Sequence, residues 1–251
     1  MDGIIETRVN GGLSLLEPER GQRFGTDALL LAAFARGHLG KGRCADFGTG
    51  SGILPLLLLS AGSGNDFSAY EIQELYARLA SENAERNGFG DRMTVFRGDL
   101  REHRTLFPCG AFSSVISNPP YFPAGSGIRS GAPERQIARH AETLTAEDLC
   151  AAVSWGLKSG GKFFCVYLPS GAAVLFHALR AAGVEPKRLR PVAPSPGEPP
   201  SLILVEAKKN AAPGLIFEKT FFIYEADDSA DSSGRRDFSG EMREVFGLFS
   251  V

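Results

Sequence analysis

A glycine-rich stretch between an expected strand and an expected helix constrains the fold of this chain more than any other feature. Residues 46–52 read Asp-Phe-Gly-Thr-Gly-Ser-Gly, and they join the apolar run 43–47 to an apolar helix expected at 51–60. At such a turn, backbone N–H groups and the helix N-terminus face a ligand at close range, and a side chain at Gly48 or Gly50 would block the approach. The alternative interpretation is a tight turn that binds nothing.

Strand-length and helix-length segments alternate along the rest of the chain, which is typical of an α/β domain with a largely parallel sheet. The expected strands are 43–47, 67–70, 93–97, 113–117, 162–168, 188–192 and 202–207. The expected helices are 51–60, 72–87, 145–157, 172–182 and one after Ser239, and a further apolar run covers 220–224. We therefore expect a seven-stranded, mostly parallel sheet with helices on both faces.

The chain shows no internal repeat and no shift in composition, so a single domain is expected. Residues 1–40 would form an N-terminal extension with one helix, and residues 41–251 the main domain. The segment 122–136, with three glycines and two prolines, is expected to be a mobile loop. The segment 193–200 is expected to be a hairpin-type connection, and 227–237 a solvated surface loop.

Charge and composition exclude several classes of protein. A net charge of −2 excludes the strongly basic surface with which proteins grip duplex DNA. No apolar stretch approaches the roughly 18 residues of a membrane span, and no signal-peptide pattern opens the chain, so a cytoplasmic protein without a membrane partner is expected. The four cysteines are widely spaced and have no histidine cluster, so we expect buried thiols and neither a metal site nor disulfides. They are Cys44, Cys109, Cys150 and Cys165.

Two further acids follow the second and third expected strands. Glu71 lies 23 residues after Gly48, close to the offset of about 20 residues at which an acid meets ribose hydroxyls in nucleotide-binding α/β sheets. Asp99 follows the third strand, where taken alone it would be an ordinary turn residue. The glycine spacing is GxGxG after an acid, without the Lys-Ser or Lys-Thr pair that holds a phosphate.

This arrangement resembles the S-adenosylmethionine loop of class I methyltransferases, whose fold is Rossmann-like. The resemblance implies that the glycine loop packs against the methionine part of the cofactor, that Glu71 binds the ribose and that Asp99 binds the adenine. The cofactor residues it implies are Asp46, Gly48, Gly50, Glu71, Asp99 and Leu100.

The tetrapeptide Asn118, Pro119, Pro120 and Tyr121 directly follows the strand expected at 113–117. It could be no more than a stiff turn. However, the Asn118 side-chain oxygen and the Pro119 carbonyl could accept both protons of an amino group and so localise its lone pair for attack. Tyr121 offers a ring on which an extruded base could stack. The pattern resembles the catalytic loop of methyltransferases that act on amino or amide nitrogen.

A second resemblance narrows the substrate. Residues 23–32 read Arg-Phe-Gly-Thr-Asp-Ala-Leu-Leu-Leu-Ala, and 137–140 read Ile-Ala-Arg-His. With the two motifs above, they resemble the bacterial tRNA1(Val) (adenine(37)-N6)-methyltransferase family over about residues 16–205. This implies methyl transfer to N6 of adenine 37 of a valine tRNA, with Phe24 and Thr26 near the methionine moiety. Thr26 is the expected cap of the helix in this stretch. The alternative interpretation of the stretch is an amphipathic packing helix without a ligand.

Basic residues after the tetrapeptide and in a later strand are candidate contacts to the tRNA anticodon arm. Because the 122–136 loop would order over the RNA, its arginines are expected on phosphates, although a solvated basic face is the simpler interpretation. The candidates are Arg129, Arg135 and Arg139 with His140, and Lys187 and Arg188 with Arg190.

Three other functions remain open. Protein glutamine methyltransferases share the tetrapeptide, but resemble one another in carrying a helical substrate domain before the glycine loop, whereas 45 residues precede Asp46 here. A ribosomal RNA guanine-N2 methyltransferase would use the same loop chemistry. A non-catalytic cofactor-binding or RNA-binding module is disfavoured, since binding alone does not need two prolines that fix hydrogen-bond acceptors.

Overall fold

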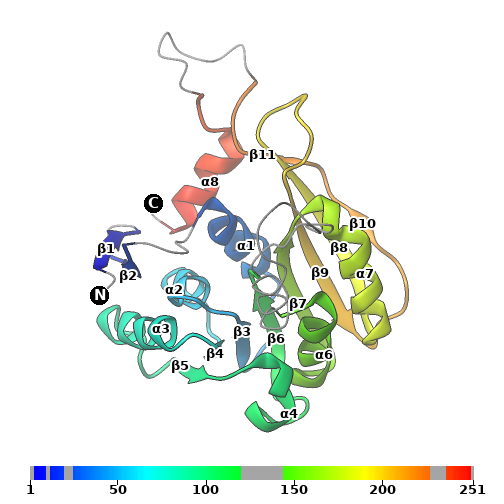
Figure 1. Ribbon diagram of the computed structural model, residues 1–251. Helices are drawn as coiled ribbons and strands as arrows, with labels where there is room; N and C mark the ends of the chain where they lie inside the picture. The colour runs from blue at the N-terminus through cyan, green and yellow to red at the C-terminus, as the bar shows by residue number, and fades with distance from the viewer. Residues whose placement is uncertain (1–2, 10–11, 20–24, 120–143, 227–235, 250–251) are drawn as a thin grey trace, which may run out of the picture.

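The computed structural model describes residues 3–9, 12–19, 25–119, 144–226 and 236–249 (Figure 1). Among these residues the main sheet has nine strands in the order β10-β8-β9-β7-β6-β3-β4-β5, with β11 beside β8. The long strands are β3 (Cys44–Phe47), β4 (Phe67–Glu71), β5 (Met93–Arg97), β6 (Phe112–Ser117), β7 (Leu157–Tyr167), β8 (Val184–Ala193) and β9 (Leu202–Lys209). They are the seven predicted strands, and the predicted fold class is confirmed.

Two very short strands extend the predicted sheet. β10 (Ile216–Phe217) and β11 (Phe221–Phe222) both pair with β8, and β11 lies within the predicted run 220–224. The strands β5, β4, β3, β6 and β7 are mutually parallel, whereas β9 runs antiparallel to β7 and β8. The connection 193–200 therefore joins antiparallel neighbours, as its composition predicted.

Helices cover both faces of the sheet, as Figure 1 shows for α2 and α3 on one side and α6 and α7 on the other. The helices are α1 (Thr26–Arg36), α2 (Ile53–Ser60), α3 (Glu74–Arg86), α4 (His103–Leu106), α6 (Ala146–Gly156), α7 (Ala172–Ala181) and α8 (Gly240–Phe249), and the 3-10 turns are η1 (Leu100–Glu102) and η2 (Pro169–Gly171). In the part of the chain that the structure describes, no helix is long and apolar enough to cross a bilayer.

Alternating side chains of the central strands build two cores. Phe164 on β7 packs in the core with α1, α2 and α8, whereas its neighbours Phe163 and Cys165 pack in the core with α6 and α7. Successive residues of a strand point to opposite faces, so one fully buried strand can fill both cores. α6 begins with a capping box between Thr145 and Asp148, which satisfies backbone donors at its first turn.

A β-hairpin that the sequence did not predict precedes α1. It consists of β1 (Ile4–Arg8) and β2 (Ser14–Pro18), paired antiparallel. An isolated two-stranded hairpin is only marginally stable in water, so this one depends on its contacts with the rest of the protein. Leu13 and Leu15 are buried in the core that includes α1 and α2. The division of the chain at residue 40 stays a prediction.

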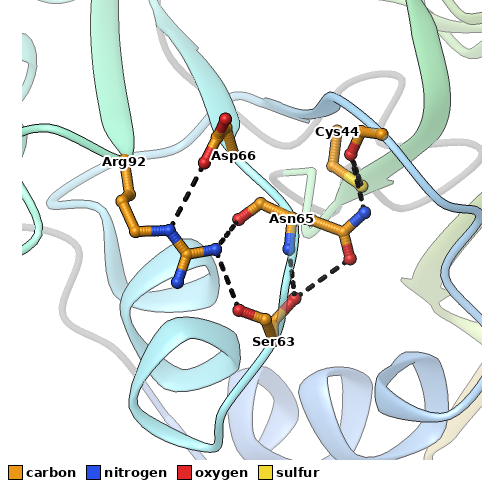
Figure 2. Close-up of polar contacts among 6 residues, drawn as sticks. Cys44, Ser63, Asn65, Asp66 and Arg92 are labelled. Atoms are coloured by element: carbon orange, nitrogen blue, oxygen red, sulfur yellow. Dashed lines mark hydrogen bonds and ion pairs between the residues drawn. The ribbon is translucent and has the colours of Figure 1, made fainter.

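A polar network occupies the sheet edge at the amino ends of β3 and β4 (Figure 2). The Arg92 guanidinium donates to the carbonyls of Ser63 and Asn65 at 2.9 and 2.6 Å and pairs with Asp66 at 3.3 Å. The Asn65 side chain donates to the Gly42 carbonyl at 2.6 Å. These contacts hold the connection between α2 and β4 in place.

The direction in which successive strands are added to the sheet reverses between β3 and β6. From β3 the chain adds β4 and β5 on one side, and it then returns to place β6 on the other side of β3. In open α/β sheets, ligands bind outside the carboxyl ends of the strands at such a switch point. The Ser117 hydroxyl at the end of β6 donates to the Phe47 carbonyl at the end of β3, at 2.7 Å. This bond joins the glycine-rich stretch, which contains Phe47, to the residue directly before Asn118.

Candidate active site

The glycine loop leaves β3 in backbone conformations that side chains rarely adopt. Gly48, Gly50 and Gly52 have φ values of 75°, 56° and 90°. A Cβ at Gly48 or Gly50 would meet no heavy atom of the described residues within 4 Å, whereas one at Gly52 would lie 2.8 Å from the Met93 Cε atom and 3.4 Å from the Ala80 Cβ atom. Within the part of the chain that the structure describes, the first two glycines therefore border space that a ligand can enter, and the third allows close packing on α3 and β5.

Asp46 lies beneath this loop and is fully buried. Its Oδ2 accepts a hydrogen bond from the Thr49 hydroxyl at 2.6 Å, and its Oδ1 has no hydrogen-bond partner among the described residues. Burial raises the Asp46 pKa to about 7; the Glu71 charge adds to this effect and the Thr49 bond opposes it. A buried carboxyl oxygen without a donor, next to an open glycine cradle, fits a cofactor that carries cationic groups.

Glu71 fastens the loop to the end of β4. Its two carboxylate oxygens accept hydrogen bonds from the backbone N–H groups of Gly50 and Gln73, at 3.0 and 2.9 Å, and the side chain is buried. The Glu71 carbonyl accepts from Gly98 at 3.0 Å, which brings the end of β5 alongside. The predicted ribose acid thus adjoins both the glycine loop and the predicted adenine acid.

Asp99 follows β5 and caps η1. Its Oδ1 accepts from the Arg101 N–H at 2.9 Å, and its Oδ2 pairs with the Arg101 guanidinium at 2.5 Å. These hydrogen bonds hold the pKa of Asp99 below its usual value. Leu100 is the buried first residue of η1. Asp46, Glu71 and Asp99 therefore stand at the carboxyl ends of three consecutive strands, as the sequence predicted. The cofactor-binding roles of these acids, of the two glycines and of Leu100 stay predictions.

Asn118 follows β6 at the same edge and contacts α1. Its amide nitrogen donates to the Asp27 Oδ2 atom at 2.9 Å. Because a carboxylate only accepts hydrogen bonds, the amide nitrogen must face Asp27. The Oδ1 atom of Asn118 therefore points to the other side of the amide group. Asp27 lies in the stretch 23–32, but no local pattern indicates its role, since its partner Asn118 lies 91 positions later.

The start of α1 differs from the sequence prediction. The N-cap is Gly25 and makes no side-chain cap bond, while Thr26 is the exposed first residue of the helix. Thr26 as the cap is therefore wrong, and its place near the cofactor stays a prediction. Pro119 is buried directly after Asn118. Phe24, Pro120 and Tyr121 lie outside the described residues.

Arg188 is occupied by contacts that stabilise the fold. Its side chain is 16% exposed, and its guanidinium lies 3.1 Å from both Glu206 and Glu218. It also stacks over the Phe34 ring at 4.3 Å and donates to the Phe34 carbonyl near the C-terminus of α1 at 3.3 Å. The Nε–Glu206 contact is an ion pair without hydrogen-bond geometry. These contacts disfavour the predicted phosphate contact at Arg188.

The other predicted RNA contacts are less constrained by the structure. The Lys187 ammonium donates to the Ala212 carbonyl at 3.1 Å, and Arg190 pairs with Glu241 and lies over the Phe221 ring at 5.0 Å. The remaining candidates, Arg129, Arg135, Arg139 and His140, lie outside the described residues. Contacts of all these side chains with RNA stay predictions.

The three buried cysteines are not reactive thiolates. Burial raises the pKa of Cys44 to about 11 and that of Cys150 to about 12, and raises the Cys165 pKa strongly. These three thiols stay protonated at neutral pH. Cys109 is exposed, so the prediction that it is buried is wrong. Within the described ranges, no three His, Cys, Asp or Glu side chains are grouped so that they could hold a metal ion.

The Asp46→Asn substitution tests the burial of Asp46. An unfolded aspartate releases its proton near pH 4, whereas native Asp46 keeps it to about pH 7. This group therefore lowers the free energy of unfolding as the pH rises from about 4 to about 7, and the loss persists above that range. We expect the free energy of unfolding of the variant to show no such fall. At pH 8 it should exceed that of the wild type by at least about 1 kcal/mol. Parallel pH profiles in urea unfolding would contradict the assignment.

Comparisons with known proteins agree with this geometry. Residues 23–169 match the methyltransferase small domain family. A tRNA1(Val) (adenine(37)-N6)-methyltransferase from Bacteroides fragilis is 32% identical over 184 residues, which cover 73% of this chain and 76% of the relative. A protein of the same name from Escherichia fergusonii is 33% identical over 148 residues, which cover 59% of this chain and 58% of the relative.

Solved structures share the fold at low sequence identity. A predicted O-methyltransferase from Agrobacterium tumefaciens superposes with a TM-score of 0.70 at 21% identity, covering 90% of this chain and 97% of that one. TrmN from Thermus thermophilus superposes with a TM-score of 0.53 at 20% identity, covering 72% of this chain and 48% of that one. At these identities the likeness concerns the fold alone.

Proposed function

Because the chain belongs to the bacterial tRNA1(Val) (adenine(37)-N6)-methyltransferase family, within the methyltransferase small domain family, we propose that its substrate is adenine 37 of a valine tRNA. The enzyme is an S-adenosylmethionine-dependent methyltransferase. The observation that carries the substrate class is Asn118, which stands beside the glycine loop with its amide nitrogen held by Asp27. This arrangement suits an acceptor that carries an NH2 group.

The side chains at the end of β6 would activate that NH2 group. The lone pair of an exocyclic amino group is delocalised into the ring, so the nitrogen is a poor nucleophile. Hydrogen bonds from its two N–H groups to the Asn118 Oδ1 and Pro119 carbonyl oxygens would favour a tetrahedral nitrogen with a localised lone pair. Asn118 is held from α1 and Pro119 is buried, so both acceptors are fixed before the substrate arrives.

The cofactor, when bound, supplies a methyl group on a positively charged sulfur. Open space at Gly48 and Gly50 and the buried carboxyls of Asp46 and Glu71 would hold it at the end of β3 and β4. The amino nitrogen becomes positively charged as it gains the methyl group, and it then loses one proton to solvent. Asp27 would stabilise that transient charge, since its carboxylate lies one amide away from the reacting nitrogen.

The RNA partner follows from the substrate. We propose that the anticodon arm contacts the segment that follows Asn118, with Arg129, Arg135 and Arg139 on phosphates and Lys187 farther along the same chain. Arg188 is left out of this surface because two carboxylates already hold its guanidinium. A tRNA substrate would also place the enzyme in the cytoplasm.

Methyl transfer from labelled cofactor to total tRNA tests the proposal. The protein is incubated with radiolabelled S-adenosylmethionine and tRNA from cells that lack this modification, and the RNA is digested to nucleosides. We expect label in N6-methyladenosine, confined to a valine tRNA and absent with the Asn118→Ala variant. Label in N2-methylguanosine would indicate a guanine-N2 enzyme, and label in protein a glutamine methyltransferase. Either result would overturn the tRNA adenine assignment.

A further inference from the structure

Asn83 of α3 and Asn87, the C-cap of the same helix, bind the N-terminal hairpin as a neighbouring strand would. The Asn87 side chain accepts from the Ser14 N–H at 3.0 Å and donates to the Ser14 carbonyl at 2.7 Å. The Asn83 side chain accepts from the Leu16 N–H at 2.7 Å and donates to the Leu16 carbonyl at 3.0 Å. Residues four apart on a helix rise by about 6 Å, and alternate residues of a strand by about 6.6 Å, so the two spacings match.

Asn83 makes one further bond that reaches the candidate active site. Its amide nitrogen also donates to the Ser51 carbonyl at 2.9 Å, and Ser51 lies between Gly50 and Gly52 in the glycine loop. Among the described residues, Asn87 makes no bond to the glycine loop: its other donor bond, at 2.7 Å, goes to the Asn83 carbonyl of α3. Asn83 is 1% exposed, and both of its N–H groups and its oxygen are engaged.

The bond to Ser51 acts at a sensitive point of the loop. The Gly50 N–H is bound by Glu71, and Gly52 packs against Ala80 of the same helix that carries Asn83. A change in the position of Ser51 therefore shifts the two glycines on either side of it. Because Asn83 binds Ser51 and Leu16 with the same amide group, loss of the hairpin would leave that amide without two of its partners, and it could then reorient.

We propose that Asn83 is a positioning residue that couples docking of the N-terminal hairpin to binding of S-adenosylmethionine at the glycine loop. The proposal rests on the cofactor site and not on the identity of the RNA substrate. Coupling between two sites is reciprocal, so the cofactor must stabilise the docked hairpin to the same extent as the hairpin strengthens cofactor binding.

Asn83→Ala and Asn87→Ala form a matched pair of variants. Each removes two hydrogen bonds to β2, and only the first removes the bond to the loop. Binding of S-adenosylhomocysteine, which is unreactive, is measured by calorimetry on the full chain. We expect Asn83→Ala to weaken binding by at least about fivefold, the lower end of typical couplings, and Asn87→Ala to stay within about twofold of the wild type. Equal weakening by both variants, or no weakening by Asn83→Ala, would overturn the proposal.

Hydrogen exchange gives a second readout that does not depend on activity, and its wild-type measurement does not depend on the folding of a variant. The Leu16 N–H donates to the Asn83 oxygen, so its exchange reports whether the hairpin is docked. S-adenosylhomocysteine should slow this exchange in the wild type and in Asn87→Ala, and should have no effect in Asn83→Ala. Unchanged exchange at Leu16 in the ligand-bound wild type would exclude the coupling. Failure of the RNA assay would leave both measurements unaffected.

Discussion

The Asn118→Ala variant is expected to lose about 100- to 1,000-fold in kcat, the effect of removing one preorganised hydrogen-bond group from an active site. Its affinity for S-adenosylmethionine should stay within about twofold of the wild type, because an interaction with the reacting nitrogen acts on the transition state and not on cofactor binding. Single-turnover methylation of tRNA gives the rate, and calorimetry gives the affinity.

The thermal midpoint of the same variant provides the control. Asn118 is partly exposed after the last residue of β6, so its truncation should leave the fold intact. A kcat within about tenfold of the wild type would show that the amide oxygen is not a principal acceptor, and the mechanism would then have to rely on backbone carbonyls alone. A large loss of cofactor affinity would instead assign Asn118 to the cofactor site.

Local patterns were sufficient to predict the parts of the site that lie within one strand and its following turn. Gly48 and Gly50 follow β3, Glu71 ends β4, and Asn118 follows β6, and each could be placed because an apolar strand precedes it. The parallel order of these strands then brings their carboxyl ends to one edge. The alternation of strands and helices predicts that the sheet is largely parallel but not the order of its strands, and the structure confirms the fold class.

Contacts between distant residues could not be predicted in this way. The hairpin residue Leu16 and its partner Asn83 are 67 positions apart, and no local pattern in either segment indicates the other. For Arg188, the sequence indicates a charge but not the residues that pair with it. Its charge suggested a phosphate contact, but residues far along the chain, Glu206 and Glu218, neutralise it. Local sequence shows which residues carry charge, whereas the pairing of those charges depends on the tertiary fold.

Asp27→Ala is expected to lower kcat by about 10- to 100-fold, since a hydrogen bond to a charged group contributes about 1.5 to 3 kcal/mol. Without the carboxylate, the Asn118 amide can rotate and present its nitrogen where its oxygen is needed. Asp27→Asn retains an oxygen that can accept the bond but removes the negative charge, so its kcat should lie between those of the wild type and Asp27→Ala. The thermal midpoint must be measured as well, because the Asp27 side chain also accepts from the Ala28 N–H at the start of α1.

A double-mutant cycle separates a positioning role of Asp27 from an independent one. If Asp27 acts only by orienting Asn118, then Asp27→Ala should change kcat by less than about twofold once Asn118 is already alanine, because the two substitutions remove the same interaction. If Asp27 contributes separately, for example by stabilising the charged amino nitrogen through space, the two losses should multiply. A multiplied loss with an unchanged thermal midpoint would reject the positioning role. It would leave Asp27 as a direct electrostatic contributor that acts through space, without the 2.9 Å hydrogen bond that joins it to Asn118.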